Sequence, residues 1–146
     1  MPKRLFLCLF FACFGVTTEV IFVAISNLIN QTPYCNEPLW SLTGKTYVWM
    51  LPIYALIPLI AEPIVTKTKS WHLLLRLIFY TTLILSIEFI SGFALEQLTG
   101  KCPWEYTTGW HFMGYIRLDY IPAWMFFSFL IEYLYRFIDK NLNHVT

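Results

Sequence analysis

The chain has 146 residues, of which 58% are hydrophobic, 19% aromatic and only 13% charged. A soluble domain contains about a quarter of charged residues, so this composition argues against a soluble protein and predicts one small membrane domain over residues 1–146. A net charge of +1 without any basic tract also argues against nucleic acid as a partner.

Two apolar runs in the first half of the chain predict membrane-spanning helices. The first extends from about residue 5 to 28, which exceeds the roughly 20 residues that cross a hydrocarbon core. It continues well past Cys13, which favours an uncleaved helix over a secretory signal peptide. The second, at about 47–65, contains three prolines, so we expect a bent helix.

Two further apolar runs follow, at about 73–95 and 121–138. The segment between them, 96–120, is too polar to span the membrane but is rich in tryptophan and tyrosine. Such side chains favour the membrane–water interface, so we expect this segment to lie in the outer interface or to re-enter the bilayer. The predicted fold class is therefore all-α, an integral membrane bundle of four transmembrane helices with an interfacial or re-entrant segment between the third and the fourth.

The distribution of lysine and arginine predicts the orientation of these spans. With both termini on one side, that side carries seven lysine and arginine residues and the other side carries three. The positive-inside rule then places both termini in the cytoplasm. We expect the bacterial inner membrane as the location.

Cysteine and histidine positions bear on disulfides and metals. Cys35 and Cys102 both fall on the predicted extracytoplasmic side, where disulfides persist, and a bridge between them would join the two outer loops. Whether they are bonded depends on a Cα separation that the sequence does not give. No cysteine or histidine pair has metal-ligand spacing, so we expect neither a metal site nor another cofactor.

Each predicted span contains one glutamate, and these are Glu19, Glu62, Glu88 and Glu132. A carboxylate in lipid is costly unless it is paired, protonated or hydrated, so such residues indicate a functional site. At about 1.5 Å per residue, Glu19 lies about 21 Å and Glu88 about 24 Å from the inner end of its helix. These two share the outer half of the membrane, whereas Glu62 and Glu132 lie near its inner surface.

The inner pair of glutamates has a structural explanation. Arg136 follows Glu132 by four residues, a spacing at which an ion pair forms within a helix. Arg76 could reach either Glu62 or Glu132 from the third span. Since intramembrane charges usually pair and long basic side chains extend to the interface, we expect Glu62, Arg76, Glu132 and Arg136 to be structural.

The outer pair lacks such neighbours. No lysine or arginine lies near Glu19 or Glu88 within its own span, which leaves Lys101, Arg117, nearby hydroxyl groups or a bound ligand as partners. Glu19 and Glu88 are therefore the leading candidates for a binding site. Interhelical hydrogen bonding is the alternative explanation.

The outer segment contains a compact motif, CPWEY. Trp104 and Tyr106 supply aromatic faces with polar edges, and Glu105 adds a carboxylate between them, which suits a lipid head group or another ligand. Arg117 and Asp119 follow two residues apart. All five are binding candidates, and the alternative for Arg117 is an interface anchor paired with Asp119 or Glu105.

Several stretches of the chain resemble a known family. They are GVTTEVIF around Glu19, VWMLPIYALIPLIAEPIV around Glu62, LLLRLIFYTTLILSIEFISGF around Glu88, CPWEY, and FMGYIRLDYIPAW. This pattern resembles the transmembrane protein 229 family and related bacterial membrane proteins that are similar to type IV ABC-transporter permeases. Glu105 departs from the pattern, in which aspartate is more common. The resemblance implies a multi-pass membrane protein.

Three classes of function remain open. The first is a transport-related, permease-like component in which intramembrane carboxylates bind a cation, a proton or a cationic solute. The chain has no Walker A loop, so an ATP-driven role would need a separate nucleotide-binding subunit, and a pore would need a homo-oligomer. The second is a membrane-embedded enzyme acting on a lipid or isoprenoid, with Glu19 and Glu88 as general acid and base. The third is a non-catalytic assembly or adaptor subunit. We favour transport over enzymatic activity.

Overall fold

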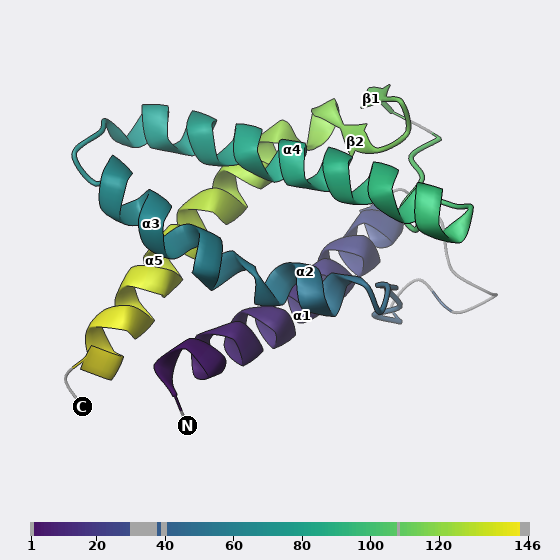
Figure 1. The fold of residues 1–146 in the computed structure, drawn as a ribbon. Coiled ribbons are helices and arrows are strands. Elements are labelled where there is room, and N and C mark those ends of the chain that lie inside the picture. Colours follow the sequence, from purple (N-terminus) through teal and green to yellow (C-terminus); the bar gives the residue numbers. More distant parts are fainter. Residues whose placement is uncertain (1, 30–37, 39–40, 108, 144–146) are drawn as a thin grey trace. The chain divides into compact units, whose positions relative to one another are not determined.

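The computed structural model describes residues 2–29, 38, 41–107 and 109–143. Its helices are α1 (Lys3–Ile29), α2 (Met50–Ala55), α3 (Ile57–Thr68), α4 (Leu73–Thr99) and α5 (Ile121–Asn143), with a short 3-10 helix η1 (Leu118–Tyr120) and strands β1 (His111–Phe112) and β2 (Ile116–Arg117) (Figure 1). Four stretches of these residues are long and apolar enough to cross a membrane: Lys3–Ile29, Met50–Thr68, Leu73–Thr99 and Leu118–Leu142. The predicted all-α membrane fold with four spans is confirmed.

The surface of the spans is apolar. Leu74 on α4 is 58% exposed and Phe126 on α5 is 62% exposed, and similar side chains cover the other spans. Such a surface is stable where lipid rather than water surrounds it. Packing within the chain divides it into two compact units, residues 1–63 and 64–146. The grouping of both into a single membrane domain stays a prediction.

The second span is broken at Leu56, between α2 and α3. Pro58 has no N–H to donate to the carbonyl of Tyr54, and its ring crowds that carbonyl. The Leu56 N–H donates to the carbonyls of Pro52 and Ile53, each at 3.2 Å, which closes α2. The interruption therefore lies where the prolines predict a bend.

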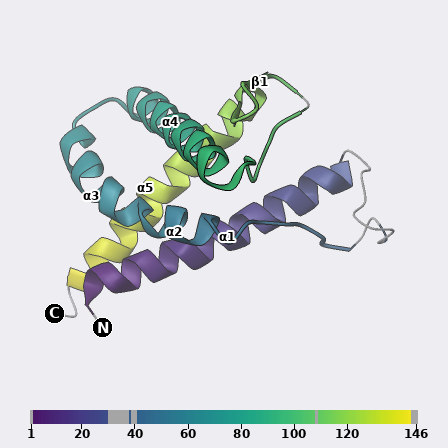
Figure 2. The ribbon, with the colours of Figure 1, turned by 45° about the vertical axis from the view of Figure 1, so that its right-hand side comes forward.

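In the unit of residues 1–63, α1 packs along α2 (Figures 1 and 2). Gly15 of α1 permits this contact, because a Cβ at this position would overlap the ring of Tyr54. Gly44 likewise lies against the backbone carbonyl of Val20, so the segment before α2 follows α1 closely. Phe11 is fully buried in this unit.

In the unit of residues 64–146, α4 packs against α5, and β2 lies beside α4 (Figure 1). α4 ends where Gly100 adopts a positive φ of 80° and donates its N–H to the carbonyl of Glu96 at 2.8 Å. α4 thus reaches Thr99 rather than the expected residue 95. β1 and β2 pair antiparallel, with His111 opposite Arg117. The depth of this outer segment in the bilayer stays a prediction.

Candidate functional site

The carboxylate of Glu88 lies near the middle of α4 and binds the CPWEY motif. Tyr106 donates its phenol O–H to Glu88 Oε1 at 2.8 Å. Trp104 donates its indole N–H to the carbonyl of Tyr115 at 3.2 Å. Gly92, one turn after Glu88, allows the rings of Trp104 and Tyr115 to approach α4, because a Cβ at this position would lie 3.3 Å from atoms of both. The motif is thus held against α4 beside the Glu88 carboxylate.

Aromatic and ionic contacts extend this site from Tyr106 to Arg117 and Asp119. The ring of Tyr106 meets the ring of Tyr120 edge to face, with 6.1 Å between the ring centroids. The Arg117 guanidinium lies 4.2 Å from the centroid of Tyr120 and donates from Nη2 to Asp119 Oδ2 at 2.6 Å. This hydrogen bond to the Asp119 carboxylate raises the pKa of Arg117. Arg117 therefore pairs with Asp119, and a continuous chain of contacts runs from Glu88 to this pair.

Two residues beside the site, Tyr115 and Glu96, were not predicted from the sequence as binding candidates. Tyr115 donates its phenol O–H to Glu96 Oε2, and this hydrogen bond, together with burial, raises the pKa of Tyr115 to about 12. Tyr115 therefore stays a donor at neutral pH. The four-residue intervals from Glu88 to Gly92 and Glu96 could have indicated that these residues share one side of the helix. Glu105, in contrast, is exposed, and its carboxylate has no ion pair within the part of the chain that the structure describes.

Glu19 has a comparable environment in the unit of residues 1–63. Thr46 donates its hydroxyl to Glu19 Oε2 at 2.7 Å, and Tyr54 donates its phenol to the same oxygen at 3.1 Å. Both donors are neutral, and the described residues give this carboxylate no ion pair. Thr46 and Tyr54 were not predicted, although Gly15, one turn before Glu19, indicates a close approach of another segment. Glu19 and Glu88 belong to different compact units, so a site that contains both stays a prediction.

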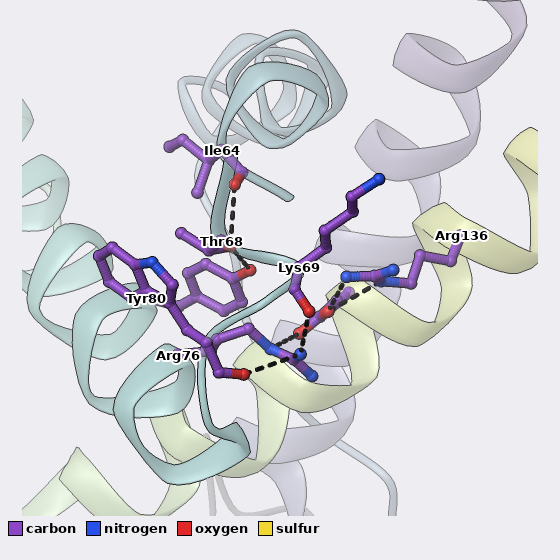
Figure 3. Close-up of polar contacts among 8 residues, drawn as sticks. Ile64, Thr68, Lys69, Arg76, Tyr80 and Arg136 are labelled. Carbon is purple, nitrogen blue, oxygen red and sulfur yellow. Dashed lines mark hydrogen bonds and ion pairs between the residues drawn. The ribbon is translucent and has the colours of Figure 1, made fainter. Parts of the chain in front are cut away.

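The Glu132 carboxylate, in contrast, forms ion pairs with two arginines, Arg76 and Arg136, both of which are labelled in Figure 3. Arg136 donates from Nε to Glu132 Oε1 at 2.8 Å, and Arg76 Nε lies 3.3 Å from Glu132 Oε2. Arg76 also donates from Nη1 to the carbonyls of Lys69 at 3.4 Å and Trp71 at 3.5 Å. This cluster joins α4, α5 and the loop before α4. The two guanidinium groups more than compensate the charge of the Glu132 carboxylate, which supports a structural role.

Further contacts lie close to this cluster. Thr68 donates its hydroxyl to the carbonyl of Ile64 at 2.8 Å and lies 2.5 Å from the phenol oxygen of Tyr80, so α3 is joined to α4 (Figure 3). The remaining intramembrane carboxylate, Glu62, lies 3.5 Å from the guanidinium of Arg4, and both side chains are exposed. Arg76 therefore contacts Glu132, whereas Glu62 forms an ion pair with Arg4.

The described residues give little support for a metal site or for the predicted disulfide. Among them, no three histidine, cysteine, aspartate or glutamate side chains form a cluster that could hold a metal ion. Cys102 is buried, and burial raises the pKa of its thiol. Cys35 lies outside the described residues, so its bond to Cys102 stays a prediction.

Comparison with known proteins gives one family. The family described as "Putative ABC-transporter type IV" matches residues 6–146, which include the outer segment and all of the four spans except the first three residues of the first span. No solved structure matches the chain.

Proposed function

The chain belongs to the family described as "Putative ABC-transporter type IV", and we propose that it is a permease-like component whose intramembrane carboxylates bind a cation or a proton. It is a transport-related integral membrane protein, and bilayer lipid surrounds its four spans. The 146 residues contain no Walker A loop, so we assign nucleotide binding to a separate subunit if ATP drives the transport. The proposal also includes a homo-oligomer, since four helices enclose little space.

The main support for the proposal is the hydrogen bond of 2.8 Å that Tyr106 donates to Glu88. A carboxylate within a span is costly, and a neutral phenol donor orients it without cancelling its charge. Glu19 has two neutral donors in the same way, whereas two arginines compensate Glu132. A carboxylate that hydroxyl donors hold in place can bind a cation or take up a proton. These contrasts support Glu19 and Glu88 as the binding residues.

The proposal also covers the membrane in which the chain lies, its orientation there and its relation to a second family. The excess of lysine and arginine on the terminal side supports a bacterial inner membrane protein with both termini in the cytoplasm. The stretches around Glu19, Glu62 and Glu88 support a relation to the transmembrane protein 229 family. Labelling of single cysteines introduced in the two termini, with a reagent that does not cross membranes, tests the orientation.

Reconstitution into vesicles of phosphatidylethanolamine and phosphatidylglycerol tests the function. Sodium, potassium and proton flux are measured for the wild type, Glu19→Gln and Glu88→Gln, with Glu62→Gln as the matched control because Glu62 also lies in a span but forms an ion pair with Arg4. We expect Glu19→Gln and Glu88→Gln to lose flux of one cation by about tenfold or more, and the control to keep it. If both variants only lower the thermal stability and retain every flux, the carboxylates are structural.

The two other classes of function give different results in the same material. A membrane-embedded enzyme would change the lipid or isoprenoid composition of the vesicles, and Glu88→Gln would abolish that change. An adaptor subunit would tolerate Glu88→Gln in every flux and lipid measurement.

A further inference from the structure

Five polar side chains lie on α4 and α5, two helices that pack against each other. They are Thr81 and Glu88 on α4 and Trp124, Ser128 and Glu132 on α5, and we refer to this set as the polar seam. Thr81 and Glu88 are seven residues apart and the three members on α5 follow at intervals of four, so each set shares one side of its helix. Thr81 is 4% exposed, Ser128 2% and Glu132 5%.

The hydroxyl groups of the polar seam differ from the others on α4. Thr82, Ser86, Ser91 and Thr99 each donate to the backbone carbonyl four residues earlier. Thr81 Oγ1 and Ser128 Oγ are buried and have no hydrogen-bond partner among the described residues, and the same holds for Trp124 Nε1. Buried polar groups without a protein partner are usually hydrogen-bonded to ordered water. The seam therefore has several places for bound water.

The seam has a definite register. Arg76 on α4 and Glu132 on α5 meet at one end of the seam, where Arg76 Nε is 3.3 Å from Glu132 Oε2. At about 1.5 Å per residue, Thr81 and Glu88 lie about 7.5 and 18 Å beyond Arg76 along α4, and Ser128 and Trp124 lie about 6 and 12 Å from Glu132 along α5. Successive polar groups on α5 are thus about 6 Å apart along the helix, close to the roughly 5.6 Å that one water bridges with two hydrogen bonds of about 2.8 Å.

The ends of the seam are both carboxylates. At one end Glu132 Oε2 and Arg76 Nε lack hydrogen-bond geometry in spite of their ion pair, so these atoms are also available to water. At the other end Tyr106 orients Glu88. A proton can pass along such a row when each water or hydroxyl accepts one proton and releases another, with no net change of the row.

We infer that bound water fills the polar seam and that the seam conducts protons between Glu88 and the Glu132 cluster. This inference rests on the proposed function and deepens it, because it names the proton as the transported ion and gives its route. The hydroxyls of Thr81 and Ser128 are positioning residues that hold the water in line.

Water in the seam is tested directly by solid-state NMR in bilayers, through polarisation transfer from water to side-chain carbons. We expect transfer to the Cβ atoms of Thr81 and Ser128 and none to Val65, which is 7% exposed and apolar. A dry seam, in which Thr81 and Ser128 behave like Val65, overturns the inference.

Conduction is tested by the decay of a pH gradient in vesicles with an entrapped fluorescent pH indicator. We expect Thr81→Val and Ser128→Ala to slow the decay about tenfold, which corresponds to a barrier about 1.4 kcal/mol higher. Thr82→Val and Ser86→Ala are matched controls on exposed, internally bonded hydroxyls and should retain the wild-type rate. Thr81→Ser keeps the hydroxyl and should also retain the wild-type rate. That result would show that Thr81→Val slows the decay through the loss of the hydroxyl and not through a loss of packing.

The outcomes separate the seam from the proposed function. If Thr81→Val and Ser128→Ala conduct protons like the wild type while Glu88→Gln abolishes flux, the inferred proton route through the seam is wrong and the carboxylate site is supported. If the wild type carries sodium or potassium but no protons, the seam is again wrong. If Glu19→Gln and Glu88→Gln both retain every flux, the proposed function is wrong.

Discussion

Substitution of Glu132 by glutamine should destabilise the protein strongly. The Glu132 side chain is only 6% exposed, and its carboxylate lies 2.7 Å from Arg136 and 3.3 Å from Arg76. Glu132→Gln keeps the size of the side chain but removes the charge that both arginines face. The variant therefore isolates the electrostatic part of the cluster from its packing.

The two arginines contribute unequally to the expected loss. Arg136 is 43% exposed and can turn toward solvent, so we assign its pair at most about 1 kcal/mol. Arg76 is 18% exposed and has fewer ways to be hydrated, so we assign its interaction about 2 kcal/mol. The sum of about 3 kcal/mol agrees with the range of about 3 to 5 kcal/mol for one broken partner of a buried pair. At about 2 to 4 °C per kcal/mol for a chain of this size, Tm should fall by about 6 to 12 °C.

The measurement is thermal unfolding in detergent, followed by size-exclusion chromatography of heated samples. Glu105→Gln is the control, since its side chain is exposed, and its Tm should stay within about 2 °C of the wild type. A double variant, Arg76→Met with Glu132→Leu, should recover part of the loss, because it removes both buried charges together. A Tm of Glu132→Gln within about 2 °C of the wild type would refute this account of the cluster.

Three further predictions concern the outer segment. Gly92→Leu should displace Trp104 and Tyr115 from α4, lower the free energy of unfolding by about 2 kcal/mol and shift the tryptophan emission to longer wavelength. Gly100→Ala is the control: its Cβ meets no neighbouring atom, and the φ of 80° alone should lower the free energy of unfolding by only about 1 kcal/mol. The hydrogen bond to Glu96 raises the Tyr115 pKa from 10.0 to about 12, so the stabilisation is fully present below pH 10 and the free energy of unfolding should fall as pH rises from 10 to 12. Tyr115→Phe should reduce this fall, and an equal fall in both proteins would contradict the assignment. The thiol of Cys102 is free in the structure, so mass spectrometry without reduction decides the predicted bond to Cys35: joined peptides would confirm it, and two free thiols would exclude it.

The spans were predictable because hydropathy and length are local properties of the sequence. The break at Leu56 was predictable for a similar reason, since Pro58 acts on the carbonyl of Tyr54 within its own turn. The end of α4 was missed by four residues, from 95 to Thr99. Hydropathy falls at Glu96, but backbone hydrogen bonds continue in a polar environment until Gly100 adopts its positive φ.

The partners of the candidate residues were less predictable because they come from distant segments. Tyr54 is 35 residues from Glu19, and Tyr106 is 18 residues from Glu88. No spacing rule on one helix connects such pairs. The ion pair of Glu132 and Arg136 is the opposite case, since a spacing of four residues places both side chains on one helix face.

The two adjacent threonines Thr81 and Thr82 show where a membrane sequence stops being informative. Thr82 is exposed and bonded to the carbonyl of Ile78, whereas Thr81 is 4% exposed and its hydroxyl has no hydrogen-bond partner within the part of the chain that the structure describes. In a soluble protein an apolar stripe would identify the buried side of the helix. Lipid is as apolar as a neighbouring helix, so the residues on both sides of α4 are similar and the pattern carries little information about orientation. Only the packing of α4 against α5 separates the two hydroxyls, and any function of the polar seam therefore depends on a difference that the sequence alone does not contain.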